Sequence, residues 1–347
     1  MTKVYVGMSG GVDSSLTAAL LKEQGYDVTG VYMKNWTQDL PGMKCPWADD
    51  LADAKRVAVQ LGIDFKVFDF ENEYKHKVVD YMIDEYRRGR TPNPDIMCNQ
   101  EVKFSLFLET ALEEGADMIA TGHYAKTENG QLKLVVDSNK DQTYFLYRVS
   151  GDALQKTLFP LGEYDKPTVR AMAQERGLYT AAKKDSQGIC FVGQIGIREF
   201  LSQYVEQVAG PIIDTQTGKK IGQHDGAIFY TIGQRHGLDI GGGLPYYVVG
   251  KDMEKNEVYA TTDLNDNALW RPEIKLQDIQ WINNTPQSGR YLVRVRHRAP
   301  LVEAGLVMND DNSITIQLDH PERAVAAGQS VVIYRDDVCL GGGIVQP

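Results

Sequence analysis

The sequence predicts an α/β protein: a parallel sheet with helices on both faces, followed by a small β-rich central domain and a C-terminal antiparallel β-barrel. Strand-like apolar runs alternate with helix-like runs through residues 1–205, as they do in parallel sheets with crossover helices. After Gly210 the pattern changes to short alternating strands between glycine turns. A further boundary lies at Arg271-Pro272, so we expect domains at 1–205, 206–270 and 271–347.

Periodicity and end signals predict the elements of the first domain. Residues 48–61 carry apolar side chains on one helical face, and Gly62 stands at the C-cap position. The expected strands are 4–7, 28–33, 63–70 and 118–122; the expected helices are 12–25, 48–61, a stretch ending at Gly89, 103–114, a stretch from Pro167 to Gly177, and 197–205. Residues 91–95 (Thr-Pro-Asn-Pro-Asp) are expected to be irregular, because two prolines one residue apart are incompatible with helix and central strand.

The last segment is expected to form a small antiparallel barrel, with strands at 291–298, 313–318, 330–334 and 338–345. Alternation along the first of these strands places Arg294, Arg296 and Arg298 on one face. That face would make a phosphate-binding stripe, and the alternative is a charged face that is simply exposed to solvent.

A glycine-rich turn joins the first strand to the first helix. The stretch reads Val4-Tyr5-Val6-Gly7-Met8-Ser9-Gly10-Gly11-Val12-Asp13-Ser14-Ser15. Unpaired N–H groups in a first helical turn favour an anion, and Gly10 and Gly11 let a phosphate approach the backbone. Ser14 adds a hydroxyl donor, and Asp13 is expected to bind a phosphate-bound magnesium ion. The alternative is a helix that happens to begin with such a cap, and no Gly-Lys-Ser/Thr follows to make a Walker A loop.

Two further residues are expected beside this turn. Ligands of parallel sheets bind beyond the carboxyl ends of the strands. Met33 and Gly122 end the predicted strands 28–33 and 118–122. We therefore expect them to share one cleft with the glycine-rich turn, although Met33 at a strand end could also serve packing alone.

Composition limits the class of protein. The chain of 347 residues is 42% hydrophobic and 24% charged, which is typical of soluble globular proteins. No apolar run has the length of a membrane span and the start lacks the apolar core of a signal peptide, so we expect a cytoplasmic protein with no membrane partner. A net charge of −10 argues against indiscriminate nucleic-acid binding, but a local basic patch is sufficient for a specific RNA.

Two of the four cysteines stand in unusual loops. Cys98 follows the rigid Pro-Asn-Pro-Asp turn, and Cys190 lies in a glycine-flanked loop after Lys183 and Lys184. Nearby cations and helix N-termini lower the pKa of a thiol and make it nucleophilic, and the alternative for each cysteine is a small buried side chain. We expect no zinc site and no other metal site built by these cysteines, because no CxxC pair occurs and no histidine stands at ligand spacing from a cysteine.

The glycine-rich turn resembles the SGGxDS loop of the PP-loop ATP pyrophosphatases, which adenylate an oxygen and release pyrophosphate. Over essentially its whole length the chain resembles the tRNA-specific 2-thiouridylases (the MnmA/TrmU family). The likeness is carried by Gly7 to Ser14, Gly89-Arg90-Thr91-Pro92-Asn93-Pro94-Asp95-Ile96-Met97-Cys98-Asn99, Ala120-Thr121-Gly122-His123-Tyr124, Asp137-Ser138-Asn139-Lys140-Asp141-Gln142-Thr143-Tyr144-Phe145-Leu146, Asp185-Ser186-Gln187-Gly188-Ile189-Cys190-Phe191 and Cys339-Leu340-Gly341-Gly342-Gly343. Many members have threonine where this chain has Gln187.

The resemblance implies an adenine nucleotide alpha-hydrolase-like PP-loop domain and 2-thiolation of the wobble uridine of tRNA. ATP, with Mg²⁺, would adenylate the C2 oxygen, and persulfide sulfur would replace that oxygen and release AMP. Cys190 matches the position that takes the persulfide from a sulfur-carrier or cysteine desulfurase protein, and Cys98 matches its partner, with which it can form a disulfide. Cys98, Cys190 and Asp13 are the expected catalytic residues. The expected ATP contacts are Gly7, Met8, Ser9, Gly10, Gly11, Val12, Asp13, Ser14, Met33 and Gly122.

The resemblance also implies contacts with RNA. Asn93, Pro94 and Asp95 would contact the target base, with an Asx turn as the alternative for Asp95. The expected tRNA contacts are Lys140, Asp141, Gln142, Arg296 and His297. A solvated surface side chain is the alternative for Lys140, and Arg296-His297 stands where the family has an Arg-Tyr pair.

Two other functions remain open. Another PP-loop adenylating enzyme, such as an amidotransferase-type synthetase, would need no cysteine pair. A nucleotide-binding redox sensor would use Cys98 and Cys190 as a switch, and the β-rich domains would then have no explanation.

Overall fold

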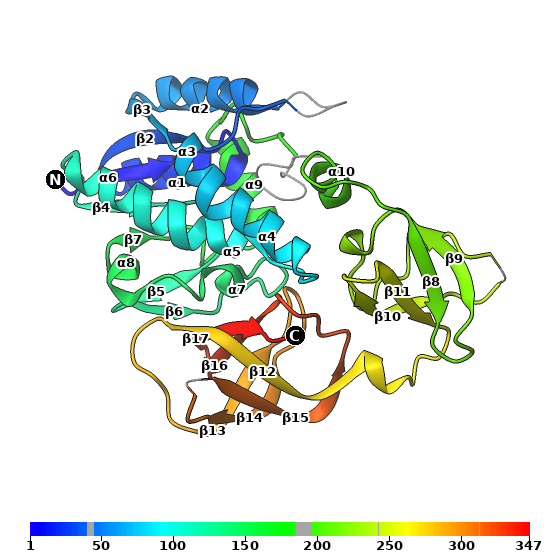
Figure 1. The fold of residues 1–347 in the computed structure, drawn as a ribbon. Helices are drawn as coiled ribbons and strands as arrows, with labels where there is room; N and C mark the ends of the chain where they lie inside the picture. The colour runs from blue at the N-terminus through cyan, green and yellow to red at the C-terminus, as the bar shows by residue number, and fades with distance from the viewer. Residues whose placement is uncertain (40–44, 185–195, 242, 312) are drawn as a thin grey trace.

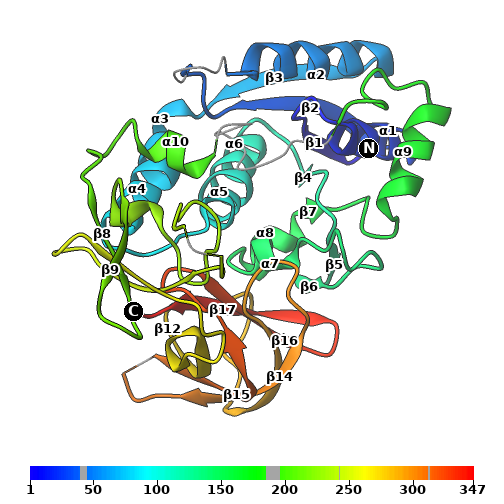
Figure 2. The same ribbon diagram turned by 90° about the vertical axis from the view of Figure 1, so that its right-hand side faces the viewer.

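The computed structural model describes residues 1–39, 45–184, 196–241, 243–311 and 313–347 (Figure 1). Three sheets organise these residues. Figures 1 and 2 show a helix-covered sheet formed by the N-terminal part, a barrel on one side of it and a smaller sheet beside both.

The first sheet is parallel and has the strand order β3-β2-β1-β4-β7. Its strands are β1 (Lys3–Gly7), β2 (Asp27–Lys34), β3 (Asp64–Asp69), β4 (Met118–Ala120) and β7 (Thr157–Leu158). The chain moves outward from β1 in one direction and returns on its other side through β4. The carboxyl ends of β1 and β4 therefore flank the switch point at which sheets of this kind bind ligands.

Helices cover both faces of this sheet, as the sequence predicts. Val4 and Val6 of β1 pack in one core with α1 (Val12–Glu23) and α2 (Trp47–Leu61). Tyr5 points to the opposite face and belongs to a second core. The helices of this second core and of the remaining N-terminal part are α3 (Glu71–Tyr74), η1 (Lys75–Asp80), α4 (Tyr81–Arg87), α5 (Pro94–Cys98), η2 (Asn99–Leu106), α6 (Phe107–Glu113), α7 (Thr143–Leu146), α8 (Gly151–Gln155), α9 (Lys166–Glu175) and α10 (Ile197–Leu201).

The prediction of an irregular segment at residues 91–95 is wrong at its end. Pro94 and Asp95 form the first turn of α5. Asn93 caps that helix, because its Oδ1 accepts hydrogen bonds from the N–H groups of Asp95 (3.2 Å) and Ile96 (3.4 Å). A proline at the first helical position loses no hydrogen bond, since that N–H has no intrahelical acceptor.

The central sheet has the order β10-β11-β8-β9. Its strands are β8 (Gly210–Asp214), β9 (Lys220–His224), β10 (Tyr247–Asp252) and β11 (Glu257–Thr261), with a short η3 turn (Ala227–Phe229) between β9 and β10. The predicted change to short strands after Gly210 is confirmed. The domain bounds at 206 and 271 stay predictions.

The C-terminal barrel is closed by pairing of its first and last strands, β12 and β17. It contains β12 (Trp270–Trp281), β13 (Gly289–Arg294), β14 (Val302–Met308), β15 (Ile314–Arg323), β16 (Ser330–Arg335) and β17 (Val338–Val345), with a short η4 turn (Asn267–Leu269) before β12. The hairpin β5 (Lys126–Glu128) and β6 (Gln131–Lys133) pairs with β17. The antiparallel barrel is thus confirmed, and its sheet continues into the N-terminal part of the chain.

No helix within the described ranges is both long enough and apolar enough to span a bilayer.

Candidate functional site

The glycine-rich turn leads from the end of β1 into α1. Met8 donates its N–H to the carbonyl of Val31 (2.7 Å), which keeps the chain on the sheet for one more residue. Ser9 N–H then donates to the Oγ of Ser14 (3.1 Å), and that hydroxyl reaches back to the carbonyl of Gly11 (3.2 Å). These local bonds fold the backbone around the helix start, where first-turn N–H groups are available to an anion.

Gly10 has a backbone conformation that the turn requires. Its φ is +73°, and a Cβ at this position would collide with the backbone of Asp50 in α2. Any other residue would meet both the left-handed strain and that collision. The first turn of α2 therefore packs directly against the loop that the sequence predicts to be the phosphate site.

Met33 and Gly122 lie against this turn, as expected from the strand ends. A Cβ on Gly7 would stand 2.9 Å from the Cε atom of Met33. A Cβ on Gly122 would stand 2.8 Å from the backbone nitrogen of Ser14. The predicted convergence of three strand ends is confirmed, whereas ATP contact by these residues stays a prediction.

The carboxylate of Asp13 is held by two residues that sequence reasoning missed. Lys166 donates from Nζ to Oδ1 (2.7 Å) and Oδ2 (2.8 Å), and the hydroxyl of Tyr124 donates to Oδ1 (2.9 Å). Tyr124 stands two residues after Gly122, which was a usable signal. Lys166 lies 153 positions from Asp13, and only the fold reveals this pair.

Magnesium coordination by Asp13 was expected from its place in the turn, and the geometry fits that expectation poorly. Both carboxylate oxygens already accept hydrogen bonds from an ammonium group. A metal ion bound there would lie beside this ammonium group, and the two positive charges would repel each other. Among the described residues, no group of three or more His, Cys, Asp and Glu side chains is arranged to hold a metal ion.

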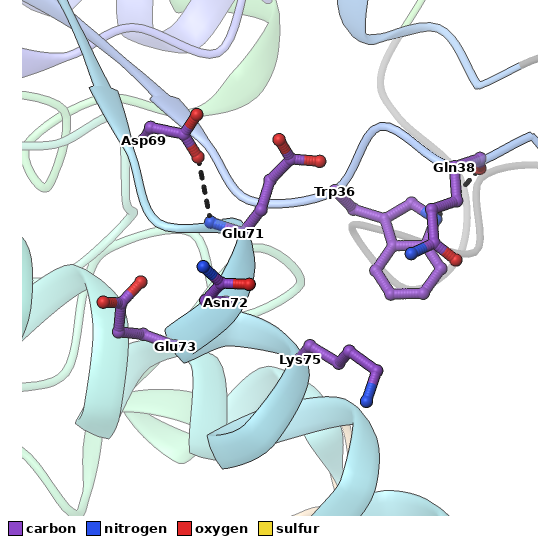
Figure 3. Close-up of a pocket in the computed structure, with 7 residues that line it drawn as sticks. All are labelled: Trp36, Gln38, Asp69, Glu71, Asn72, Glu73 and Lys75. Atoms are coloured by element: carbon purple, nitrogen blue, oxygen red, sulfur yellow. Dashed lines mark hydrogen bonds between the residues drawn. The ribbon is translucent and has the colours of Figure 1, made fainter.

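An acidic cavity of about 350 Å³ lies beyond the ends of β2 and β3. Figure 3 shows its lining residues: Trp36, Gln38, Asp69, Glu71, Asn72, Glu73 and Lys75. Lys34 pairs with Asp69 (3.1 Å) and also with Glu71. Three carboxylates repel a polyphosphate, so this cavity is unsuited to the phosphates, which the glycine-rich turn can hold.

Cys98 ends α5, the helix that Asn93, Pro94 and Asp95 begin. Its side chain is only 1% exposed. The next residue, Asn99, donates its amide to the carbonyl of Phe145 (3.0 Å). One helix thus carries both the residues expected at the target base and the cysteine expected to complete sulfur transfer.

Cys190 lies in residues 185–195, outside the described residues, as does Gln187. The described chain on either side of this stretch can be placed. Lys183 donates to Asp50 (2.7 Å) and Asp53 (2.8 Å) of α2, next to the turn on which α2 presses. On the other side, Phe200 of α10 packs against Trp36 of the acidic cavity, with ring centroids 6.1 Å apart.

The three residues expected to contact tRNA after β6 differ in exposure. Lys140 is partly exposed, and Gln142 accepts a hydrogen bond from the N–H of Tyr124 (2.8 Å). Asp141 is 2% exposed and pairs with Arg294 of the barrel (3.0 Å). Direct contact between the Asp141 carboxylate and RNA is therefore contradicted by burial, because the ion pair faces the interior.

The predicted arginine stripe on one strand face is wrong. Strand β13 ends at Arg294, whose side chain is buried, and Arg298 has a φ of +62°, so the alternation stops. Arg296 is exposed and donates to the carbonyl of Arg323 (3.1 Å). The ring of His297 packs on Phe145, with centroids 4.4 Å apart.

Comparison of the sequence with known proteins identifies the family of this chain. Family models described as tRNA methyl transferase HUP domain, tRNA methyl transferase PRC-barrel domain and Aminomethyltransferase beta-barrel domain match residues 2–194, 198–262 and 271–345. Proteins named tRNA-specific 2-thiouridylase MnmA from Bacillus thuringiensis (strain Al Hakam) and Bacillus anthracis are each 46% identical over 99% of this chain and 94% of theirs.

The chain belongs to the tRNA-specific 2-thiouridylase family. The match to relatives of that name covers nearly the whole chain and therefore includes all three sheets. The resemblance first seen in the cysteine-containing segments is thereby confirmed.

Two solved structures that are similar to the chain are more distant. A U34-tRNA thiolase NcsA from Methanococcus maripaludis has a TM-score of 0.37 and 20% identity, covering 58% of this chain and 64% of its own. A 4-thiouridine synthetase in complex with RNA and bound ATP has a TM-score of 0.39 and 18% identity, covering 59% of this chain and 50% of its own.

Proposed function

We propose that this protein is an ATP-dependent tRNA-uridine 2-sulfurtransferase that modifies the wobble uridine. One observation carries the proposal. The glycine-rich turn, Met33 and Gly122 meet at the switch point of a parallel sheet, in a chain that is 46% identical over 99% of its length to named 2-thiouridylases. The site and the family therefore indicate the same chemistry.

The first step is adenylation of the target uridine. The C2 oxygen attacks the α-phosphorus of ATP, a P–O bond forms, and the bond to pyrophosphate breaks. Backbone N–H groups of residues 7–14 would stabilise the charge that develops on the departing pyrophosphate. The oxygen, which is otherwise a poor leaving group, then leaves later as part of AMP.

The second step is sulfur transfer from a persulfide on Cys190. Its terminal sulfur attacks C2, and the C2–O bond breaks with release of AMP. The thiolate of Cys98 then attacks the Sγ of Cys190, so that the sulfur remains on the base and a Cys98–Cys190 disulfide forms. A thiol reductant must reopen this disulfide before the next turnover.

The remaining assignments follow from this scheme. Asn93, Pro94 and Asp95 contact the base, which must leave its stack to reach the site. Lys140, Gln142, Arg296 and His297 lie at the tRNA interface, with Asp141 supporting it from inside. A sulfur-carrier or cysteine desulfurase protein loads Cys190, Mg²⁺ accompanies ATP, and the protein works in the cytoplasm, where tRNA and ATP occur.

Nucleoside analysis tests this function. Unmodified tRNA is incubated with the protein, ATP, Mg²⁺ and a persulfide donor. The tRNA is then digested, and its nucleosides are separated and identified by mass spectrometry. We expect ATP-dependent 2-thiouridine with the wild type and none with Cys190→Ser or Cys98→Ser. The Cys190→Ser protein should still release pyrophosphate and leave the tRNA adenylated, because adenylation precedes sulfur transfer.

Cys339→Ala is the matched control, since Cys339 is a buried cysteine of the barrel. It should thiolate tRNA normally. A methylated nucleoside in place of a thiolated one would support the methyl transferase description carried by the family models. Adenylation of another acceptor would indicate a different PP-loop synthetase, and nucleotide binding without an RNA product would indicate the redox sensor.

A further inference from the structure

The ammonium group of Lys166 is fixed at the start of α1. It donates to both carboxylate oxygens of Asp13, at 2.7 and 2.8 Å. It also lies 5.8 Å from the ring centroid of Tyr124, whose hydroxyl donates to the same carboxylate at 2.9 Å. Lys166 is 9% exposed as a residue, so this cation is held almost entirely within the protein.

The backbone of Lys166 is also fixed. Lys166 and Pro167 open α9, and the side chain of Asp165 caps that helix by accepting the N–H of Thr168 (2.9 Å). Val169 and Ala173 of α9 pack in one core with Leu16 and other residues of α1. The two helices therefore hold the ammonium in a constant position relative to the glycine-rich turn.

A pyrophosphate site needs positive charge, and the turn supplies little of it. Residues 7–14 contain no lysine or arginine. A Walker A loop carries its own lysine to the phosphates, but here the loop offers only backbone N–H groups and the partial charge of a helix end. The Lys166 ammonium comes from α9 and lies beside Asp13 in the first turn of α1, where such a cation would act.

The ion pair lies at the start of α1 and is exposed to solvent mainly on its carboxylate side. The side chain of Asp13 is 31% exposed and that of Lys166 is 11% exposed. Asp13 therefore lies on the solvent side, and a phosphate reaching the first turn of α1 meets the pair there.

We propose that Lys166 binds the pyrophosphate part of ATP, and that Asp13 and Tyr124 position its ammonium. The inference rests on the proposed ATP chemistry and goes beyond it by assigning the cation of the site. Asp13 then acts through Lys166, and magnesium is held by the phosphate oxygens with no carboxylate from the turn.

Equilibrium binding by calorimetry tests this assignment, with inorganic pyrophosphate, ATP and AMP as probes. Lys166→Ala should weaken pyrophosphate and ATP binding by about 10-fold to 100-fold, the usual loss for a charged hydrogen bond, and leave AMP binding within about twofold. Lys166→Arg should retain part of the pyrophosphate affinity. Lys126→Ala is the matched control, because Lys126 pairs with Glu163 (2.8 Å) outside the turn, and it should bind all three probes normally.

Chelation of divalent ions separates the two roles of Asp13. If Asp13 positions Lys166, Asp13→Asn should weaken pyrophosphate binding in EDTA as well as in Mg²⁺. A loss seen only with Mg²⁺ would instead make Asp13 a metal ligand and overturn the proposal. Tyr124→Phe, which removes one hydroxyl, should give a smaller loss of the same kind.

A purely structural ion pair gives a different pattern. Lys166→Ala would then lower the thermal midpoint of unfolding and either leave pyrophosphate affinity unchanged or reduce AMP and pyrophosphate binding equally, and each of these results contradicts the proposal. Pyrophosphate binding needs neither tRNA nor sulfur. The assay therefore remains decisive for Lys166 even if the wild type forms no 2-thiouridine, and the reverse holds as well.

Discussion

At the scale of single residues, the site depends on positions whose backbone or burial leaves little choice. Gly10 is one example, with its positive φ and with the backbone of Asp50 where a side chain would begin. His297 is another, since its ring packs on Phe145 between the barrel and α7. Each position gives a prediction that can be measured without knowing the RNA substrate.

Gly10→Ala should destabilise the fold and weaken ATP binding. The left-handed backbone costs roughly 1–3 kcal/mol for a non-glycine residue, and the collision with α2 adds to it. Gly25→Ala is the matched control, because Gly25 has a φ of +87° with no atom within 4 Å of the new Cβ. Urea unfolding should show a clearly larger loss for Gly10→Ala, and equal losses would mean that the contact with Asp50 does not matter.

His297 should make the stability of the protein depend on pH. Burial, together with the charges of Arg298 and Arg294, lowers the pKa of His297 to about 4. Below the unfolded pKa of about 6.5 the unfolded chain binds a proton that the folded chain does not, so stability falls as pH falls from about 6.5 toward 4. His297→Phe should reduce the loss of unfolding free energy between pH 7 and pH 5 by about 1–2 kcal/mol.

Denaturant unfolding across this pH range measures the effect. Above about pH 7.5 the ring of His297 is uncharged in the folded and in the unfolded protein. Any constant difference in unfolding free energy between the wild type and His297→Phe at such pH therefore reports the change in packing alone. Parallel pH profiles for the wild type and His297→Phe would contradict the assignment of this histidine.

At the scale of elements, the segment that leads into α5 is held from both β-rich parts of the chain. Thr91 donates its N–H to the carbonyl of Ala327 (2.8 Å), and its own carbonyl accepts the amide of Gln329 (2.7 Å). Its hydroxyl lies 3.1 Å from that of Thr231 in the central part. The barrel and the central sheet thus jointly position the turn that starts the helix of Cys98.

Gln329→Ala should therefore slow thiolation more than it weakens ATP binding. Loss of one hydrogen bond costs about 1 kcal/mol and frees the carbonyl of Thr91. Hydrogen exchange followed on peptides covering residues 89–98 should become faster, with a lower single-turnover rate. Gln280→Ala removes a bond made within the barrel and should change neither quantity, and the same change in both variants would exclude specific positioning.

The elements themselves could be predicted to different extents. The glycine-rich turn and Gly62 carry local signals, and both were found where the sequence placed them. Strand β12 was missed, since nearly all of its residues are exposed or half-buried and only Ile274 and Leu276 are buried in alternation. The helix start at Pro94 was also missed, because proline was weighed as a breaker and not as a first helical residue.

In the candidate site, too, only residues with local sequence signals could be predicted. Residues 7–14 could be found from the sequence because their chemistry is local. The partners Lys166 and Arg294 could not, because each lies 153 positions from the carboxylate it meets. Burial of Asp141 was equally hidden, since an acidic residue is buried only when a partner compensates its charge.

At the scale of the whole molecule, the barrel is joined to the N-terminal part through its core. Asp141 and Arg294 form a buried ion pair (3.0 Å), and Thr143 lies within hydrogen-bond distance of Tyr334 (3.1 Å). The hairpin β5–β6 extends the barrel sheet. We therefore expect the barrel and the nucleotide-binding part to unfold together.

Arg294→Leu should destabilise the protein by roughly 3–5 kcal/mol, because it leaves the buried Asp141 carboxylate without its partner. The double variant Arg294→Leu, Asp141→Leu should regain most of this loss, since both charges are removed. Arg290→Ala, which breaks a pair on the surface, should unfold at the wild-type denaturant concentration. A double variant less stable than Arg294→Leu would contradict the coupling.

The proposed reaction requires that ATP activates the C2 oxygen of the wobble uridine. A tRNA that carries an oxygen isotope label at C2 of the wobble uridine can be thiolated in a single turnover. The mass of the released AMP is then measured by mass spectrometry. We predict that the label leaves the base and appears in AMP. Unlabelled AMP formed alongside 2-thiouridine would contradict adenylation at that oxygen, and with it the mechanism proposed for this site.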